Sequence, residues 1–431
     1  MALVTNAPSY GRLQNNLLRT LWLGFFQVFL VFMPIAVPFF QSKGLSMQDV
    51  FVLQAWFGFV VLITEVPSGY LADLFGRKIT LLVGAVAVGV GNSVLLVADG
   101  FWGLALFELC LGIGHSLISG ADVALLYDTE LALGRGEQAQ RQIVGRLYGF
   151  QTVSESIAAL LCSLLLLHSM QAVVVVQAIA GWLPLVLAVM LVEPPGSRLA
   201  SDDHLGNMTE ICRLLLTRSR LLRLIVLALC IWSLTTFFAV WLLQKIWEDQ
   251  GIDLVHFGWL WAGLTVASAV AGRWAHRAED LLGTTGLMLF IGLSPVVGYL
   301  GLQHFGVIGG YLASATFFVS RGFGLVVLRD ALNRRVPSQY RATANSLTSF
   351  GFRGAFMLTG PLVGYYLDLW GMQATLYLLA LATLVIFLVL VLPLLLAVRG
   401  LPTNRELDRR ELALLNAPPA PESFVEKVPG G

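Results

Sequence analysis

The stretch "SGYLADLFGRK", from Ser68 to Lys78, places three charged residues between two long apolar runs. The run "FVLQAWFGFVVLITEVP" (51–67) precedes it, and the run "ITLLVGAVAVGVGNSVLLV" (79–97) follows it. Each run has close to the roughly 20 apolar residues that an α-helix needs to cross a bilayer. The charged stretch is therefore predicted to be a short loop at a membrane surface, between two spanning helices.

The composition extends this prediction to the whole chain. Hydrophobic residues make up 57% of the 431 residues and charged residues 12%, against about 45–50% and about 25% in soluble domains. A soluble core cannot bury that much apolar surface, so the excess is predicted to face lipid. The alternating pattern of a β-barrel does not occur, and the sequence indicates an all-α integral membrane protein with twelve transmembrane helices. The twelve apolar runs lie near 17–40, 49–71, 78–98, 102–127, 144–168, 170–192, 221–246, 255–275, 284–303, 306–328, 344–366 and 373–397.

Positively charged residues are distributed unevenly over the loops between these runs. If the N-terminus lies inside, 23 of the 27 lysine and arginine residues fall in cytoplasmic loops and terminal segments. Only Lys43 and Lys245 then fall outside, and Arg321 and Arg353 lie within apolar runs. The positive-inside rule predicts from this distribution that both termini are cytoplasmic.

A polar segment divides the apolar runs into two sets of six. It reads "VEPPGSRLASDDHLGNMTEICRLLLTRSR" (192–220). The sequence on its two sides is similar, because "ALLYDTE" (124–130) corresponds to "VVLRDAL" (326–332), as expected for two six-helix pseudo-repeats that enclose a midplane site. The predicted regions are a cytoplasmic N-terminus (1–16), an N-terminal six-helix bundle (17–192), a cytoplasmic linker (193–220), a C-terminal six-helix bundle (221–397) and a cytoplasmic tail (398–431).

The charged loop after the second run carries a Gly-x-x-Ala-Asp-x-x-Gly-Arg-Lys pattern. Its residues are Gly69, Ala72, Asp73, Gly76, Arg77 and Lys78. The pattern resembles the loop signature of the major facilitator superfamily, and the surrounding sequence resembles the bacterial, drug-exporter-like branch of that family. The resemblance implies the major facilitator fold, in which spans one, four, seven and ten line a central cavity. It also implies a membrane transporter that works by alternating access.

This loop is predicted to act as a conformational latch. Gly69 and Gly76 would permit close packing and a tight turn, and Asp73 would cap the N-terminal end of a neighbouring helix. Arg77 would pair with Asp128 at the inner end of the fourth run. In the family that the chain resembles, a charge network of this kind steadies the outward-facing state. The alternative is that the charges only anchor the loop at the cytoplasmic surface.

Ionisable residues inside the first six runs are candidates for substrate or proton binding, because charges at membrane depth are costly and are functional by default. On the fourth run Glu108, His115, Ser119 and Asp122 are expected to share one face of a continuous helix. Glu155 lies in the fifth run. Glu108 is nearest the outer end, and it could instead reach water at the membrane surface.

The last six runs contribute Arg321 and Arg353, and three interpretations of the buried charges stay open. In the first, His115 and the acids carry protons while the arginines hold an anionic group of a substrate. In the second, acids and arginines pair across the two halves. In the third, His115 and the acids of the fourth run bind a divalent metal, but their spread along a helix disfavours a compact ligand set. We therefore predict no metal site.

Glu155 and Arg353 are the central charges of the fifth and eleventh runs, and they could either pair with each other or act separately. If they meet across the interface, each offsets the cost of burying the other. If they act separately, Arg353 holds the substrate and Glu155 carries a proton. Glu65, two helical turns before the charged loop, could belong to the latch network.

The predicted function is a secondary active transporter for a small amphipathic or anionic solute, with proton-coupled export favoured. The fifth run, "SESIAALLCSLL" (154–165), lacks the Gly-Pro-x-x-Gly-Gly pattern of many exporters, and a related "TGPLVG" (359–364) occurs in the eleventh. The alternatives are a proton-coupled importer, a uniporter, and a non-transporting receptor or lipid-handling protein on the same fold.

Other classes of protein are disfavoured by missing motifs. The sequence has no Gly-x-x-x-x-Gly-Lys-Ser/Thr, His-Glu-x-x-His or Gly-x-Ser-x-Gly motif, so neither an enzyme nor a cofactor is predicted. The expected partners are a small-molecule solute, protons and the lipid bilayer of a bacterial inner membrane. We expect no nucleic acid partner and a monomeric protein.

Overall fold

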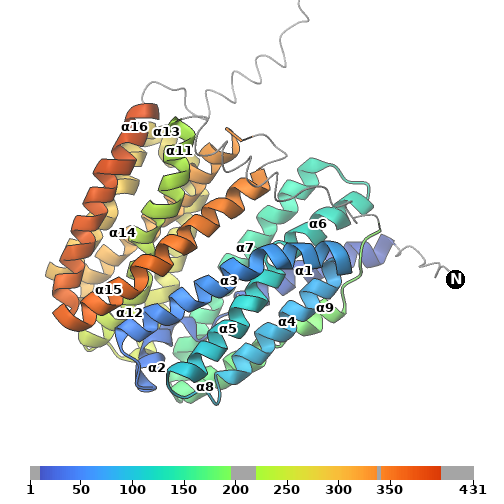
Figure 1. Cartoon of the computed structure of the whole chain (residues 1–431), viewed down its shortest axis with the longest axis horizontal. Coiled ribbons are helices and arrows are strands. Elements are labelled where there is room, and N and C mark those ends of the chain that lie inside the picture. Colours follow the sequence, from blue (N-terminus) through green and yellow to red (C-terminus); the bar gives the residue numbers. More distant parts are fainter. Residues whose placement is uncertain (1–9, 196–219, 337–340, 399–431) are drawn as a thin grey trace, which may run out of the picture.

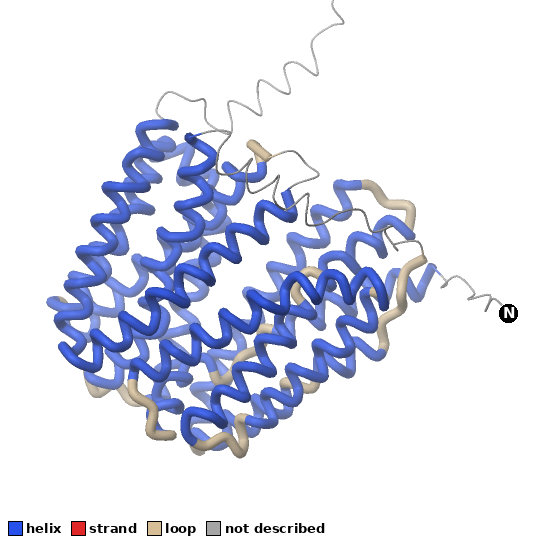
Figure 2. The backbone as a smooth tube through the Cα atoms, viewed as in Figure 1, coloured by secondary structure: helices blue, strands red, loops and turns tan. Residues whose placement is uncertain are grey.

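The computed structural model describes residues 10–195, 220–336 and 341–398, and the regular structure in these ranges is helical throughout. Figure 2 shows the helices running between two ends of the molecule, where most of the loops lie. The predicted all-α class is therefore confirmed. Within the described ranges, nine helices are long and apolar enough to cross a membrane. They agree with an integral membrane protein, while the number of twelve spans stays a prediction.

The helices form two groups that follow each other in the sequence (Figure 1). The first group holds α1 (Tyr10–Gln27), α2 (Ala36–Ser42), α3 (Met47–Phe75), α4 (Arg77–Val94), α5 (Gly100–Ile118), α6 (Ala121–Ala132), α7 (Glu137–Leu166), α8 (Met170–Ala180) and α9 (Leu183–Val189). The second group holds α11 (Arg220–Leu227), a π-helical segment (Ala228–Trp232), α12 (Ser233–Asp249), α13 (Phe257–His304), α14 (Gly306–Asn333), α15 (Arg341–Ile386), a second π-helical segment (Phe387–Val391) and α16 (Leu392–Val398).

The structure describes only some of the boundaries between the five regions predicted from the sequence. α1 begins at Tyr10, so the first helix starts within the predicted N-terminal region 1–16. Most of the predicted linker (193–220) and nearly all of the predicted tail (398–431) lie outside the described residues. The division into five regions thus stays a prediction.

Two helices of the second group turn back on themselves. α13 has 48 residues and α15 has 46, and a helix of that length would measure about 70 Å, more than twice the hydrocarbon thickness of a bilayer. The backbone leaves the helical conformation at Gly283 (φ +69°) in α13 and at Gly371 (φ +77°) in α15. These left-handed positions favour glycine. Gly283 divides α13 into two stretches of spanning length, and the stretch of α15 after Gly371 reaches that length together with the second π-helical segment and α16.

The first predicted span is not one continuous helix. α1 ends at Gln27, and a short 3-10 segment, Met33–Ile35, leads into α2. Pro34 lies in that segment and Pro38 lies in α2. Proline lacks an N–H donor and disfavours helical backbone at the preceding residue, which explains the interruption.

Side chains from other helices bind the backbone groups that this interruption frees. The Phe32 N–H donates to Gln177 Oε1 on α8 at 3.3 Å. Gln244 on α12 uses both ends of its amide, because its Oε1 accepts from the Val37 N–H at 2.9 Å and its Nε2 donates to the Met33 carbonyl at 3.1 Å. Unpaired backbone groups are costly at membrane depth, so these glutamines allow the chain to be non-helical there.

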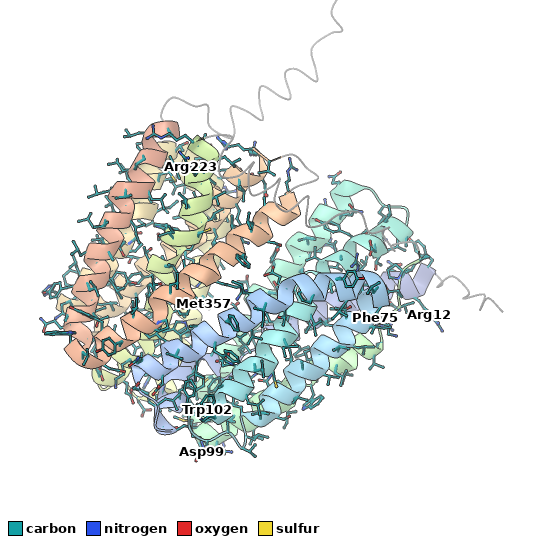
Figure 3. The ribbon with its side chains drawn as sticks, in the orientation of Figure 1. Arg12, Phe75, Asp99, Trp102, Arg223 and Met357 are labelled. Atoms are coloured by element: carbon teal, nitrogen blue, oxygen red, sulfur yellow. The ribbon has the colours of Figure 1, made fainter. Side chains whose placement is uncertain are left out.

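The two groups of helices meet at one end of the bundle and diverge toward the other (Figure 1). Figure 3 labels Asp99 and Trp102 at the first end and Arg223 at the second. Lys43 shares the end of Asp99, since Lys43 Nζ lies 3.9 Å from Asp99 Oδ1. Asp368 lies at this end too, because it binds the N–H groups of Met47 and Gln48 shortly after Lys43. Arg77 begins α4, whose other end leads to Asp99, so Arg77 lies at the opposite end. We call these ends the Asp368 end and the Arg77 end.

Hydrogen bonds between the two groups cluster toward the Asp368 end. Asp368 on α15 accepts from the backbone N–H groups of Met47 at 3.2 Å and of Gln48 at 2.8 Å, which form the N-terminus of α3. Ser163 Oγ on α7 accepts from the Trp259 N–H at 3.2 Å, at the start of α13. The carboxylate of Asp368 is well placed there, because the N-terminus of a helix carries partial positive charge.

Candidate functional site

A cavity of about 450 Å³ lies between the two groups of helices. The non-helical segment before α2 contributes to its wall, together with α2, α3, α4, α5, α8, the first π-helical segment, α12, α14 and α15. Its volume is within the range of small-molecule sites. Aromatic rings make up much of the lining: Phe32, Phe40, Phe57, Phe107, Phe237, Trp241, Phe352 and Phe356.

The second group of helices supplies a basic wall. Arg321 and Arg329 on α14 and Arg353 on α15 line the cavity. Among the described residues, two buried donors of this wall have no hydrogen-bond acceptor, and these are Nε of Arg353 and Nε1 of Trp241. Trp241 is only 5% exposed. The sequence indicates Arg321 and Arg353 as candidates, whereas it places Arg329 at a cytoplasmic loop and favours a packing or lipid-facing role for Trp241.

Two glutamates of the first group face these arginines across the interface. Glu155 on α7 interacts electrostatically with Arg321, and Glu65 on α3 interacts with Arg353. Arg321 is thus the arginine that interacts with Glu155, and the separate roles of Glu155 and Arg353 stay a prediction. Glu65, a possible member of the latch network, lies near Arg353 of the cavity wall. The reason is the packing of α3 along α15, which carries Glu65 toward Arg353 (Figure 1).

His115 belongs to the same region. It lines the cavity next to Phe57, and the centroids of the two rings are 6.0 Å apart. Cζ of Arg353 is also 6.0 Å from the centroid of the Phe57 ring. Three of the predicted candidates, His115, Arg321 and Arg353, therefore line one cavity. Their roles with substrate and protons stay predictions.

Asp122 is not part of the cavity lining. The expected face along the fourth span needs a continuous helix, but α5 ends at Ile118 and Gly120 has φ +92°. Asp122 Oδ1 accepts from the backbone N–H groups of Gly120 at 3.2 Å and of Val123 at 2.7 Å, at the start of α6. The helical phase does not continue across this break, and the prediction that Asp122 shares a face with Glu108 and His115 is wrong.

Glu108 is buried in the cavity wall, and it does not reach water at the membrane surface. It is 5% exposed, and its Oε1 accepts from Gln54 Nε2 on α3 at 2.8 Å. A second hydrogen-bonded pair of polar side chains lies in the same wall, where Gln177 Nε2 donates to Asn92 Oδ1 at 2.9 Å. No sequence spacing indicates these pairs, because their members lie 54 and 85 residues apart.

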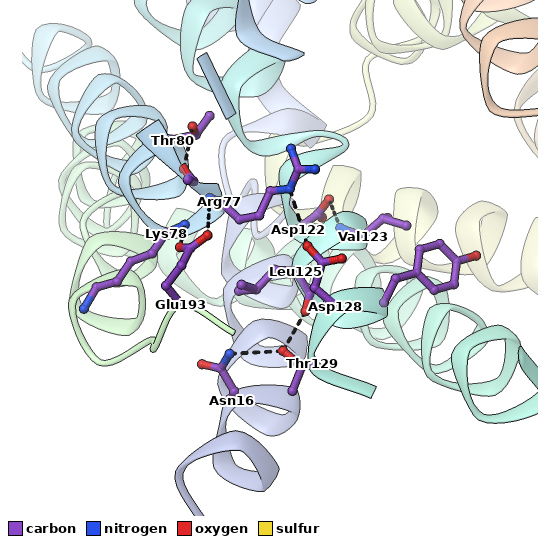
Figure 4. Close-up of polar contacts among 12 residues, drawn as sticks. Asn16, Arg77, Lys78, Thr80, Asp122, Val123, Leu125, Asp128, Thr129 and Glu193 are labelled. Carbon is purple, nitrogen blue, oxygen red and sulfur yellow. Dashed lines mark hydrogen bonds and ion pairs between the residues drawn. The ribbon is translucent and has the colours of Figure 1, made fainter. Parts of the chain in front are cut away.

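The predicted ion pair of the charged loop is present (Figure 4). Nε of Arg77 lies 3.6 Å from Oδ2 of Asp128 on α6, and both side chains are largely buried. Gly76 has φ +96°, which agrees with the predicted tight turn. The use of this loop as a conformational latch stays a prediction.

The other predicted contacts of the loop differ in the structure. A Cβ atom at Gly69 would meet no described atom within 4 Å, so the expected close packing is not found there. The N-terminus of α4 is capped by Glu193, whose carboxylate accepts from the backbone N–H groups of Arg77 at 2.8 Å and of Lys78 at 2.7 Å (Figure 4). The side chain of Asp73, which was expected to cap a helix, lies outside the described part of the structure.

The described residues offer no ligand set for the divalent metal that the third interpretation requires. Among residues 10–195, 220–336 and 341–398, no three histidine, cysteine, aspartate or glutamate side chains come close enough together to hold a metal ion.

Comparison with known proteins connects the sequence to a transporter family. The family model "Major Facilitator Superfamily" matches residues 20–333. An uncharacterized MFS-type transporter of Burkholderia mallei is 25% identical over 336 residues, which cover 73% of this chain and 75% of that protein. The probable sulfoacetate transporter SauU of Cupriavidus necator is 22% identical over 362 residues, which cover 78% of this chain and 82% of that protein.

Solved structures resemble the fold at low sequence identity. The nucleoside transporter NupG matches with a TM-score of 0.71 and 11% identity, over 90% of this chain and 100% of that chain. A bacterial homologue of the human lysosomal transporter Spinster, in an inward-facing and unoccupied conformation, matches with a TM-score of 0.73 and 13% identity, over 91% of this chain and 98% of that chain. At these identities the likeness concerns the fold alone.

Proposed function

The chain belongs to the major facilitator superfamily, and on that premise we propose that it moves a small organic anion across the membrane by alternating access. The cavity between the two groups of helices is the substrate site in this proposal. Arg321, Arg329 and Arg353 give it a basic wall, and cationic side chains at membrane depth are costly unless they have a partner. A bound anion would be such a partner.

The observation that carries this proposal is the pair of unused donors on the basic wall. Arg353 Nε and Trp241 Nε1 are buried without an acceptor among the described residues, and buried donors are normally hydrogen-bonded. Carboxylate and sulfonate oxygens are acceptors, and planar guanidinium groups bind such oxyanions well. The name of the relative from Cupriavidus necator, a probable sulfoacetate transporter, also supports an organic anion.

The glutamates near the arginines support the proposed coupling to protons. Glu155 interacts with Arg321 and Glu65 interacts with Arg353, so a solute anion competes with each glutamate for its guanidinium. A glutamate that loses its arginine at membrane depth is costly to keep charged, and a proton would neutralise it. Binding of the anion would thus be linked to uptake of a proton.

We infer that the cavity is reached from the Arg77 end, because hydrogen bonds join the two groups of helices toward the Asp368 end and the helices diverge toward the Arg77 end (Figure 1). With the predicted topology this is an inward-facing state. Exporters and importers that work by alternating access both pass through such a state. Proton-coupled export stays our prediction for the direction of transport.

The first test is transport by the purified protein in liposomes. We expect small carboxylates and sulfonates, including sulfoacetate, to be taken up in preference to matched neutral amides and alcohols of the same size. Uptake of the solute should change the pH of the lumen, and a pH-sensitive dye records this. Equal uptake of the neutral analogues would contradict the anion assignment, and uptake without any proton movement would contradict the coupling.

The predicted topology has its own test. Asp99 is at the Asp368 end with its side chain 88% exposed, and Leu281 is at the Arg77 end and 85% exposed. Single cysteines at these positions, in a background without native cysteines, should react differently with a membrane-impermeant maleimide. In intact cells the cysteine at 99 should be labelled and the one at 281 should not. The reverse pattern would overturn the predicted orientation.

A further inference from the structure

We infer that Glu108 and Gln54 form a second polar pole of the cavity, which binds a hydrogen-bond-donating group of the solute. This inference rests on the proposed function, because it concerns the end of the anion that does not bind the arginines. The solute class would be a small acid with a hydroxyl or ammonium group at its far end, rather than a simple acid or a diacid.

The first argument is the environment of Glu108. Its side chain is 5% exposed and lines the cavity. Gln54 is 8% exposed and holds Oε1 of Glu108 with a hydrogen bond of 2.8 Å from Nε2. A carboxyl group accepts several hydrogen bonds, so one donor from Gln54 leaves capacity for a ligand.

The second argument is that Glu108 lacks the kind of partner that the other acids have. Glu65 and Glu155 each interact with an arginine of the opposite group. In the described ranges, none of the ion pairs involves Glu108. A buried carboxyl group without a cation is costly to ionise, and a donor group of the solute would offset that cost.

The third argument is that the neighbouring polar side chains of the cavity wall already have hydrogen-bond partners. Gln177 Nε2 donates to Asn92 Oδ1 at 2.9 Å, and Asn92 Nδ2 donates to the Val88 carbonyl at 2.9 Å. Gln177 Oε1 accepts from the Phe32 N–H at 3.3 Å. The amides of Gln177 and Asn92 therefore bind each other and the backbone. Glu108 is the acidic side chain of this wall.

The two poles belong to different groups of helices. Glu108 lies on α5 and Gln54 on α3, whereas Arg321 and Arg353 lie on α14 and α15. A solute with an acid at one end and a donor at the other would contact both groups at once. Such a ligand would link the halves across the cavity, which a simple acid held by the arginines alone would not do.

The test compares acids that differ only at the far end. One series is taurine, isethionate, propane-1-sulfonate and sulfoacetate, and a longer series is 4-(aminomethyl)benzoate, 4-(hydroxymethyl)benzoate, 4-ethylbenzoate and benzene-1,4-dicarboxylate. Binding to the purified full chain is measured by thermal stabilisation in detergent and by titration calorimetry. In at least one series, the ammonium or hydroxyl compound should bind about tenfold more tightly than the methyl compound and the diacid.

The variant Glu108→Gln removes the acid and keeps the size and the hydrogen bond to Gln54. It should lose the preference for the donor group while it still binds the simple acids. Gln54→Met, which frees the carboxyl group from its support, should reduce the same preference. Glu130→Gln serves as the matched control, because that buried acid pairs with Arg135 and does not line the cavity, so it should leave the end-group preference unchanged.

The outcomes separate the two proposals. If acids bind but the wild-type protein shows no end-group preference, or if Glu108→Gln keeps that preference, the second pole is wrong and the anion site stands. If no acid of either series binds to the wild-type protein, the anion site and the second pole are both wrong.

Discussion

Replacing Arg353 with glutamine is expected to abolish transport of the solute anion and to weaken its binding about a hundredfold. Arg353 lines the cavity, and its Nε has no acceptor among the described residues. A hydrogen bond to a charged group contributes about 1.5–3 kcal/mol, and a hundredfold change in affinity corresponds to about 2.8 kcal/mol. Titration calorimetry with a solute that stabilises the wild-type protein measures this loss.

The same substitution leaves Glu65 without the arginine with which it interacts. We therefore expect the thermal stability of Arg353→Gln to fall as well. The double variant Glu65→Gln, Arg353→Gln should regain stability but not binding, because no unpaired charge remains and the anion still has no guanidinium. If the double variant bound the solute with wild-type affinity, Arg353 would be only a structural partner of Glu65. Arg223→Gln is the matched control, since Arg223 is exposed at the Arg77 end (Figure 3).

The sequence predicted the parts of the fold that depend on local patterns. Long apolar runs indicated the helices, and the pair formed by Arg77 and Asp128 could be predicted because both lie at ends of apolar runs on the same membrane surface. The turns at Gly283 and Gly371 likewise fall between predicted runs. Such features follow from composition and from the spacing of residues along the chain.

The breaks within spans were missed although the sequence carries signals for them. Pro34 and Pro38 lie inside the first run, and Gly120 lies inside the fourth. An ideal helical period across Gly120 puts Asp122 on the face of Glu108 and His115, but the helix is broken at Gly120. Residues on the two sides of a proline or glycine in a long apolar run should therefore not be assumed to share one helical face.

The partners of the buried charges could not be predicted from one sequence. Gln54 and Glu108 lie on different helices, and Glu65 meets Arg353 only because α3 packs along α15. Glu193, which caps α4, lies 116 residues from the N–H group of Arg77 that it binds. Contacts between helices depend on how the helices are oriented and docked, and hydropathy patterns do not contain that information.

The closure of the Asp368 end also depends on such a contact. Gly364 on α15 faces the start of α3, and a Cβ atom built there would lie 2.7 Å from Cα of Gln48 and 3.0 Å from the carbonyl oxygen of Met47. Both are backbone atoms, which cannot turn aside as a flexible side chain can. The same turn of α3 donates its N–H groups to Asp368, one helical turn further along α15. Glycine at 364 thus permits the approach that these hydrogen bonds need.

We expect Gly364→Val to prevent closure of the Asp368 end and to reduce transport at least tenfold. Spin labels at Ser42 and Trp370, both exposed near that end, should move apart, while labels at Leu131 and Leu281 near the Arg77 end should approach each other. Asp368→Asn should shift the distances in the same direction but less, because asparagine adds no bulk and keeps one of the two acceptor oxygens. It loses the charge, worth about 0.3–1 kcal/mol at a helix N-terminus, and one hydrogen bond, worth about 0.5–1.5 kcal/mol. Gly354→Val is the control on the same helix, since a Cβ atom there meets no described atom within 4 Å. If Gly364→Val kept the wild-type distances and transport rate, the closed Asp368 end would not be a working state of the transport cycle.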